Sequence, residues 1–157
     1  MSAFPCSRLS VLSAALLLIG CAASPADEEE SGLLPGHVVS RIYWSDGDSG
    51  RIDGVPFRLS DVDAPETGGV GAAIGGAECE AERERGFAAK AFMVEETREG
   101  DLRVGRVVDV DRYDRVVLTI LDDGRDLSGL GVEAGHLRRW RWRNGRAIDP
   151  RPEWCSS

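Results

Sequence analysis

Short stretches of alternating apolar and polar residues predict β-strands in the first half of the chain. Residues 38–44 form the first stretch, and a turn rich in aspartate and glycine follows at 46–50. Residues 52–59 continue the pattern around Asp53-Gly54, which is typical of a two-residue hairpin turn. Three short strands within about 25 residues indicate a small barrel.

A helix is expected over residues 77–99, where glutamates and arginines are interleaved with apolar residues. Its apolar stripe contains Phe87, Ala88, Ala91, Phe92 and Val94. Gly100 follows and is expected to act as the C-cap. The glycine-rich segment before the helix, residues 67–76, predicts a mobile loop.

Two further strands are predicted at residues 102–110 and 116–121. Asp126 can cap a short helix that continues through Glu133 and stops at Gly135. Five strands with a helix between the third and the fourth are the topology of an OB-fold. The fold class expected is therefore mainly β with α: a five-stranded OB-fold β-barrel with a short C-terminal helix.

The N-terminal residues predict export. Residues 1–20 are typical of a signal peptide, because their apolar run is shorter than the roughly 20 residues that cross a bilayer. Leu18-Ile19-Gly20-Cys21 resembles the lipobox of bacterial lipoproteins, in which the cysteine is lipidated; an ordinary secretory signal cleaved nearby is the alternative. Residues 21–35 then form a flexible acidic tether, and residues 36–157 form one domain.

Composition describes a single folded domain with an acidic balance. The 157 residues are 42% hydrophobic and 29% charged, which excludes a disordered chain. Lys+Arg 19 against Asp+Glu 27 gives a net charge of −8, which by itself argues against a nucleic-acid partner. A bound divalent metal would cancel carboxylates locally, and arginines crowd into residues 138–151.

Acidic residues gather at the end of one predicted strand. Asp61, Asp63 and Glu66 follow Arg58 within ten residues, and Pro65 ends the strand. A hard cation with oxygen ligands neutralises clustered carboxylates, and a guanidinium binds two phosphate oxygens at once. This stretch therefore predicts a metal site beside an anionic substrate.

Three blocks of residues resemble the ordered signature of the staphylococcal-nuclease (thermonuclease) family. They are Asp46-Gly47-Asp48-Ser49, Phe57-Arg58-Leu59 leading to Asp63-Ala64-Pro65-Glu66, and Asp111-Arg112-Tyr113-Asp114-Arg115. The resemblance covers roughly residues 36–137, with a weaker family-like ending at Trp154-Cys155. It implies an OB-fold and Ca2+-dependent endonucleolytic hydrolysis of DNA or RNA that leaves a 3′-phosphate.

Asp48 and Asp63 are the predicted metal ligands, because oxygen-only donors suit Ca2+. The resemblance adds the main-chain carbonyl of Ala64 as a third ligand. Asp48 taken alone also fits an ordinary turn residue that bonds its own backbone. The second block of the signature, which contains Asp63, favours the metal.

The resemblance also assigns catalytic roles. Glu66 is the candidate general base for the attacking water, although a surface glutamate in a loop is the ordinary reading. Arg58 and Arg115 would clamp the scissile phosphate and stabilise the charge of the transition state. Tyr113 would touch a phosphate or stack on a base, unless it only packs.

Two departures from the family pattern concern aspartates. Asp114 stands where the family has glycine, and it adds a negative charge beside Arg115. Asp61 adds a carboxylate that is expected close to the metal. Either aspartate could pair with one of the arginines as an ordinary salt bridge. A strict two-residue strand period would also keep Arg58 and Asp63 on different faces, so a bend is expected between them.

The C-terminal residues contain a cysteine and an aromatic, basic run. With two cysteines assigned to the export segment, Cys79 and Cys155 are expected to form a disulfide in an oxidising compartment. Residues 138–146 alternate arginine with Trp140 and Trp142, as in a platform for single-stranded nucleic acid. The alternative, that the tryptophans pack on the barrel, is favoured because tryptophan is usually well buried.

Two functions follow for an exported, membrane-tethered monomer that faces the periplasm or the cell exterior. The first is a Ca2+-dependent nuclease that hydrolyses DNA or RNA with low sequence specificity. The second is a non-catalytic OB-fold lipoprotein that binds nucleic acid or an envelope partner. The acidic composition, Asp61 and Asp114 support the second.

Overall fold

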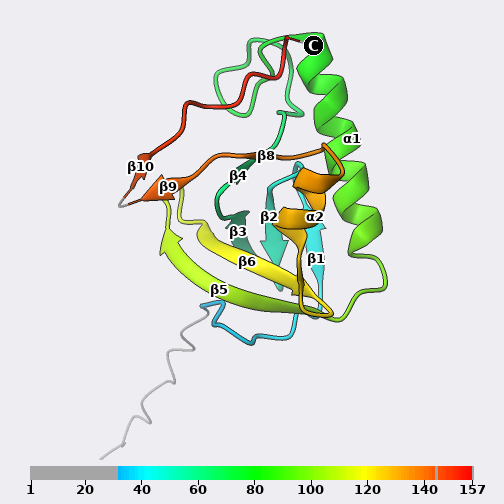
Figure 1. Cartoon of the computed structure of the whole chain (residues 1–157), viewed down its shortest axis with the longest axis vertical. Coiled ribbons are helices and arrows are strands. Elements are labelled where there is room, and N and C mark those ends of the chain that lie inside the picture. The colour runs from blue at the N-terminus through cyan, green and yellow to red at the C-terminus, as the bar shows by residue number, and fades with distance from the viewer. Residues whose placement is uncertain (1–31, 144, 157) are drawn as a thin grey trace, which may run out of the picture.

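A computed structural model describes residues 32–143 and 145–156 as a mixed α/β fold with mostly strands and two helices (Figure 1). The strands are β1 (Ile42–Trp44), β2 (Ser49–Ile52), β3 (Val55–Leu59), β4 (Val62–Asp63), β5 (Leu102–Val110), β6 (Val116–Asp122), β7 (Arg125–Asp126), β8 (Arg138–Arg139), β9 (Trp142–Arg143) and β10 (Arg146–Ala147). The helices are α1 (Glu80–Glu96) and α2 (Leu127–Glu133).

The predicted signal peptide and Cys21 lie outside the described residues, as does most of the predicted tether. Neither helix of the described chain has the length and hydrophobicity that a membrane crossing requires. The lipid anchor therefore stays a prediction from the sequence.

The main sheet is open and mixed. Its strands follow the order β1-β2-β3-β6-β5, and β7 pairs with β6. The pairs are antiparallel except β3 and β6, which run parallel with Arg58 opposite Val117. In Figure 1, α1 stands along one side of the sheet, and α2 lies between α1 and β6. The predicted closed five-stranded barrel differs from this sheet, whose edges are β1 and β5.

Asp53 explains why the ladder does not continue before β1. The backbone N–H groups of Ser40 and Arg41 donate to its carboxylate, at 3.2 and 2.8 Å, instead of to a neighbouring strand. The chain before this point still lies against β5, where Val38 forms an isolated antiparallel bridge with Arg103. The predicted strand over residues 38–44 is thereby reduced to β1.

The helix α1 is confirmed, but its buried face is not the predicted one. Glu82, Gly86, Ala89 and Met93 are buried, whereas Phe92 is the only member of the predicted stripe that is partly buried. Gly86 sets this face, because a Cβ atom there would lie 2.4 Å from the carbonyl oxygen of Glu66. The helix also ends earlier than predicted, with Thr97 as its C-cap in place of Gly100.

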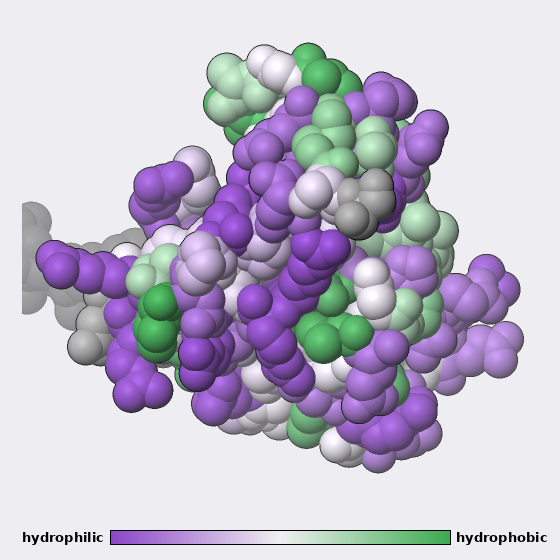
Figure 2. Space-filling model, turned by 45° about the horizontal axis from the view of Figure 1, so that its top comes forward, coloured by the Kyte–Doolittle hydropathy of each residue, from purple (hydrophilic) through white to green (hydrophobic). Residues whose placement is uncertain are grey.

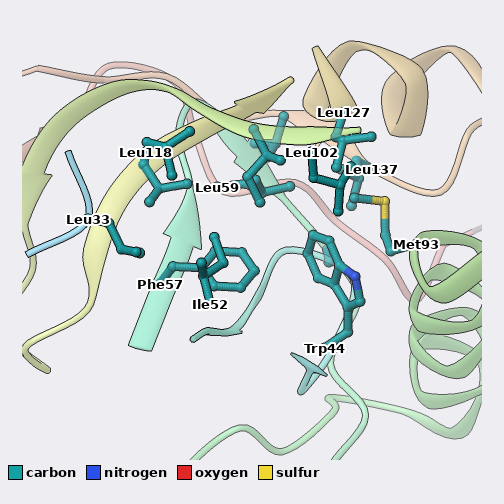
Figure 3. Packing of buried hydrophobic residues seen from close by; sticks show 14 residues of the cluster. Leu33, Trp44, Ile52, Phe57, Leu59, Met93, Leu102, Leu118, Leu127 and Leu137 are labelled. Carbon is teal, nitrogen blue, oxygen red and sulfur yellow. The ribbon is translucent and has the colours of Figure 1, made fainter. Parts of the chain in front are cut away.

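The core is formed where β1, β3, β6 and the two helices meet. Figure 3 shows the packing of Trp44 and Phe57 beside leucines from β3, β5 and β6, and the rings of Trp44 and Phe57 meet edge to face at 5.2 Å. The indole of Trp44 donates to the Thr97 hydroxyl at 3.0 Å, which satisfies a buried polar group. The short helix α2 is capped by Asp126 and followed by Gly135 in a left-handed conformation, as predicted.

The C-terminal chain returns to the first turn of α1. The predicted disulfide between Cys79 and Cys155 is confirmed, with the two Cα atoms 6.0 Å apart. Figure 1 shows this last segment running beside the loop between β4 and α1. Within that loop, Gly68 and Gly76 form an isolated parallel β-bridge. The predicted mobility of residues 67–76 stays a prediction.

Candidate functional site

An aspartate turn at the start of β2 places Asp48. The carboxylate of Asp46 accepts the N–H groups of Asp48 and Ser49, at 2.9 and 2.7 Å. The side chain of Asp48 therefore faces away from the turn and is buried. Its Oδ2 accepts the N–H of Ala64 at 3.0 Å, which ties the turn to the chain just after β4.

A bend brings Arg58 and Asp63 to one place. Ser60 and Asp61 separate β3 from β4, and Asp61 adopts a left-handed φ of 59°. The bend expected from the two-residue strand period is thus at these two residues. The Asp61 carboxylate turns away from Asp48 and Asp63, because it accepts the N–H of Trp142 at 3.3 Å. The prediction that Asp61 lies close to the metal is therefore wrong.

Arg58 joins the two predicted metal ligands. Its Nη2 lies 2.9 Å from Oδ2 of Asp48 and 3.4 Å from Oδ1 of Asp63. The same nitrogen donates to the carbonyl of Val62 at 3.4 Å. A single guanidinium thus contacts two carboxylates that are ten and five residues away in sequence. Both aspartate side chains are almost fully buried, and that of Arg58 is 20% exposed.

Glu66 lies at the edge of this cluster. Its Oε1 accepts a hydrogen bond from Nη2 of Arg151 at 3.0 Å. Its backbone N–H donates to the buried carboxylate of Glu82 at 3.3 Å, and Glu82 also accepts the N–H of Glu78 at 2.7 Å. Glu82 on α1 therefore holds both ends of the loop that begins at Glu66.

Burial shifts the pKa of every carboxyl that faces Arg58. It raises the pKa of Asp48 well above its ordinary value, with Arg58 opposing the shift and Asp46 adding to it. Burial likewise raises the pKa of Asp63 and of Glu66, although nearby arginines oppose it in both. For Arg58 burial acts to lower the pKa, and the surrounding carboxylates outweigh it and raise the pKa. Burial thus disfavours the charged forms of these carboxyls, and the neighbouring arginines offset only part of that effect.

The donor set fits a hard divalent cation. The acidic groups that meet here are Asp46, Asp48, Asp63, Glu66 and the buried Glu82, beside the guanidiniums of Arg58 and Arg151. Carboxyls outnumber guanidiniums, so a divalent cation would offset the repulsion between them. Oxygen is the only donor atom that these carboxylates offer, as Ca2+ prefers. Asp48 and Asp63 would hold the ion; the Ala64 carbonyl stays a predicted ligand.

Another acidic group in the described chain does not suit a metal. Oxygens of Glu78 and Glu82 and the sulfur of Cys155 lie within 4.8 Å of one another. That sulfur is bonded to Cys79 in a disulfide. A disulfide sulfur is not a thiolate ligand, so this group is structural.

Arg115 lies in the turn just before β6, the strand that pairs with the strand of Arg58. The parallel register places Arg58 opposite Val117, two residues after Arg115. The Arg115 guanidinium is held by Asp111, with Nε to Oδ2 at 2.8 Å. No contact joins it to Asp48, Asp63 or Glu66 among the described interactions.

Tyr113 is 60% exposed, and the Arg115 guanidinium lies 5.4 Å from the centre of its ring. Both residues belong to the turn between β5 and β6. Asp114 adopts a left-handed φ of 58° there, which explains why a glycine also suits this position. The structure thus brings together Arg58, Asp48, Asp63 and Glu66, and it leaves Arg115 and Tyr113 on a neighbouring turn.

A shallow, arginine-rich pocket borders the cluster. It is lined by Asp61, Arg139, Arg141, Trp142, Arg143 and Ile148. Trp142 is 45% exposed and meets Trp140 edge to face at 4.9 Å, while the Arg58 guanidinium lies 5.9 Å from the Trp140 ring centre. The expectation that both tryptophans pack on the body is therefore wrong for Trp142.

The pocket wall is fixed by an ion pair. Arg141 donates through Nε and Nη2 to both carboxylate oxygens of Asp149, and these bonds lower the pKa of Asp149 to about 2. Figure 2 shows that hydrophilic residues dominate the face it draws, with apolar residues in separate small patches. Such a surface suits a polar ligand better than a broad apolar partner.

Sequence reasoning missed four contributors to the site. Asp46 orders the turn, Glu82 holds Glu66, and Arg151 and Trp154 reach Glu66 and Asp63 from the end of the chain. The predicted disulfide could have indicated that Trp154 lies near the site, because Trp154 directly precedes Cys155. For Glu82, burial within α1 is the decisive feature, and the periodicity of the helix does not reveal it.

A scan against models of known protein families finds no match to this chain, and a search of curated protein sequences finds none.

Proposed function

We propose that this protein is a Ca2+-dependent nuclease that hydrolyses phosphodiester bonds of DNA or RNA with low sequence specificity. The observation that carries the proposal is the cluster around Arg58. One guanidinium contacts two buried aspartates, Glu66 lies at their edge, and carboxyls outnumber guanidiniums in the group. A divalent cation and a phosphate are the two partners that such a mixture of carboxylates and guanidiniums suits best.

Each side chain then has a role that its position supports. Asp48 and Asp63 would hold the cation, which would supply positive charge to the phosphate and lower the pKa of water. Glu66 takes a proton from the attacking water, for which a raised pKa is an advantage. Arg58 moves its hydrogen bonds from the aspartates to the phosphate oxygens and stabilises their growing charge.

Arg115 completes the clamp by exchanging Asp111 for phosphate. It lies in the turn before β6, the strand that pairs with β3, and from there it would approach the phosphate from a second side. Tyr113 beside it offers an exposed ring and hydroxyl to the same strand of nucleic acid. These assignments follow the resemblance to the staphylococcal-nuclease family, and the finer fold we propose is the OB-fold of that family.

The arginine-rich pocket supports a nucleic-acid substrate despite the acidic composition. Trp140 connects this pocket to the clamp, because its ring lies against the Arg58 guanidinium on one side and against Trp142 on the other. A single strand of nucleic acid could therefore run from the clamp over the two indoles. The disulfide supports the proposed exported location, because disulfides persist in oxidising compartments.

The test is a chelator-sensitive nuclease assay on the purified protein with single-stranded DNA. We expect degradation with Ca2+, none after chelation, and a loss of about 10²–10⁴-fold in kcat for Glu66→Gln. Glu84→Gln, an exposed glutamate on α1, is the matched control and should keep full activity. Equal rates for Glu66→Gln and the control would contradict the assignment.

One observation favours the non-catalytic alternative. Both arginines of the proposed clamp are already engaged by carboxylates of the chain itself, Arg58 by Asp48 and Arg115 by Asp111. A protein in which those pairs never open would bind nucleic acid through the tryptophan pocket without cutting it. Binding of single-stranded DNA that is insensitive to chelator, with no cleavage, would establish that function.

A further inference from the structure

The last residues of the chain reach into the site. Residues 151–155, which we call the C-terminal strap, belong to neither a helix nor a strand. The indole Nε1 of Trp154 donates to Oδ2 of Asp63 at 2.9 Å, and Trp154 is only 4% exposed. Arg151 donates to Glu66 at 3.0 Å and lies 3.8 Å from the same Asp63 oxygen. The strap thus touches one proposed metal ligand and the proposed general base.

These contacts occupy one oxygen of each carboxylate. The indole takes Oδ2 of Asp63, while Oδ1 faces Arg58. The guanidinium of Arg151 takes Oε1 of Glu66, and Oε2 lies on the side of Gly75. Outer hydrogen bonds of this kind fix the orientation of a ligand and commonly change metal affinity when they are lost.

Side chains from the rest of the molecule hold the strap. Cys155 is bonded to Cys79, the N-cap of α1. Arg85 on α1 donates to the carbonyl of Trp154, and Arg138 donates to the carbonyl of Glu153 while its guanidinium lies 4.2 Å from the Trp154 ring centre. Because the strap has no ladder of backbone hydrogen bonds, its position depends on these few attachments.

The disulfide connects the strap to the same helix turn that positions Glu66. Glu82, three residues after Cys79, holds the backbone N–H of Glu66, and Arg151 holds the carboxylate of Glu66. The first turn of α1 and the strap therefore fix Glu66 at two points. Without the disulfide, only noncovalent attachments would keep Arg151 and Trp154 at the site.

We propose that Trp154 and Arg151 are positioning residues, which fix Asp63 and Glu66, and that the Cys79–Cys155 disulfide makes Ca2+ binding and hydrolysis depend on an attached strap. This inference rests on the proposed function. It extends the site to the end of the chain, and it gives the disulfide a role in chemistry besides its role in stability.

The test compares two tryptophans in the purified full-length chain. Trp154→Phe removes the hydrogen bond to Asp63 and keeps an aromatic ring; Trp44→Phe removes a buried indole hydrogen bond far from Asp63 and is the matched control. We expect Trp154→Phe to weaken Ca2+ binding about tenfold or more, as measured by calorimetry. Trp44→Phe should lower only the melting temperature. Equal Ca2+ affinity in the two variants would overturn the inference.

The disulfide is tested by a double-mutant cycle. We expect Cys79→Ser with Cys155→Ser to weaken Ca2+ binding to a similar degree, and Trp154→Phe added to that variant to change little more, because both act through Asp63. Fully additive losses would overturn the dependence on the strap.

The role of Arg151 is tested by comparing the effects of its substitution on kcat and on KM. Arg151→Gln should lower kcat about tenfold with KM little changed, and Arg151→Lys should restore part of the rate, because a cation again reaches Glu66. No change in kcat would overturn its role. If the wild-type chain neither binds Ca2+ nor cuts nucleic acid, the proposed function itself is refuted. If the wild-type chain is active and the variants behave like it, only the role of the strap is refuted.

Discussion

The two arginines of the proposed clamp have very different surroundings. Arg58 is built into the fold, since its guanidinium joins carboxylates from β2 and β4 and its side chain is mostly buried. Arg115 sits on a turn, bonded to Asp111 of the same turn and stacked on an exposed tyrosine. Arg58 is therefore a structural part of the site before any ligand binds, whereas Arg115 is paired with Asp111 on a neighbouring turn.

This difference indicates that folding arranges the half of the site around Arg58, whereas a bound substrate would arrange the half around Arg115. The carboxylates around Arg58 lose water on folding, repel one another and depend on the Arg58 guanidinium for compensation. The Asp111–Arg115 pair is more accessible, and its opening exchanges one oxygen partner for another at little cost. Substitutions should therefore separate the two halves by their effect on stability as much as by their effect on rate.

The largest difference is expected from replacing each arginine by alanine. Both Arg58→Ala and Arg115→Ala should lower kcat by about 10²–10³-fold, because each removes charge from the transition state. Only Arg58→Ala should also lower the free energy of unfolding appreciably, by about 1–3 kcal/mol, against about 0–1 kcal/mol for Arg115→Ala. Urea denaturation beside kinetics measures both; equal destabilisation would remove the distinction.

A smaller effect is expected from releasing Arg115. Asp111→Asn keeps an oxygen that can accept the N–H groups of Tyr113 and Arg115 and removes the charge that holds the guanidinium. We expect KM for single-stranded DNA to fall by up to about fivefold, because the partly buried Asp111–Arg115 ion pair no longer has to open. Asp109→Asn, on an exposed part of β5, is the control. A rise in KM would show that Asp111 positions Arg115 for phosphate.

The smallest effect concerns pH. In the Ca2+-free protein the raised pKa values of Asp48, Asp63 and Glu66 mean that the folded state binds protons more tightly than the unfolded state. Their contribution to stability should therefore increase as pH falls through the folded pKa values. Asp111 should do the opposite, because hydrogen bonds from Arg115 and the backbone lower its pKa against the effect of burial.

Carbon-13 NMR of the carboxyl groups measures these pKa values directly. We expect Asp48, Asp63 and Glu66 to titrate above the ordinary range for their residue types, and Asp111 below the ordinary aspartate value of about 3.9. Titration of all four carboxyls in their ordinary ranges would contradict the contrast between the two halves.

Local patterns predicted the strands and turns around Arg58, whereas the roles of the side chains there came from the family resemblance. The turn before β2, the hairpin at Asp53-Gly54 and the bend before Asp63 are all determined by residues close in sequence. Asp53 has a left-handed φ of 50° and Gly54 one of 92°, as a two-residue hairpin turn requires. Short-range chemistry therefore predicts both the strands and the carboxylates that they position.

Long-range packing decided what the sequence could not predict. The buried face of α1 follows from close contact at Gly86 and from the hydrogen bonds of Glu82, and neither is visible in an apolar stripe. Trp154 and Asp63 are 91 residues apart, so nothing local connects them. The end of the β1–β2 ladder before Ile42 likewise depends on Asp53 binding residues 12 and 13 positions before it.

The pairing of Arg115 with Asp111 also has a consequence for how salt should act. A cation that is free in solution gathers mobile anions, and DNA gathers mobile cations that are released when a protein binds. An arginine that is paired with an aspartate has fewer mobile anions around it before DNA binds. When the arginine moves to a phosphate, the unpaired aspartate attracts mobile cations from solution. The affinity for single-stranded DNA should therefore fall less steeply with ionic strength than the number of phosphate contacts alone would suggest.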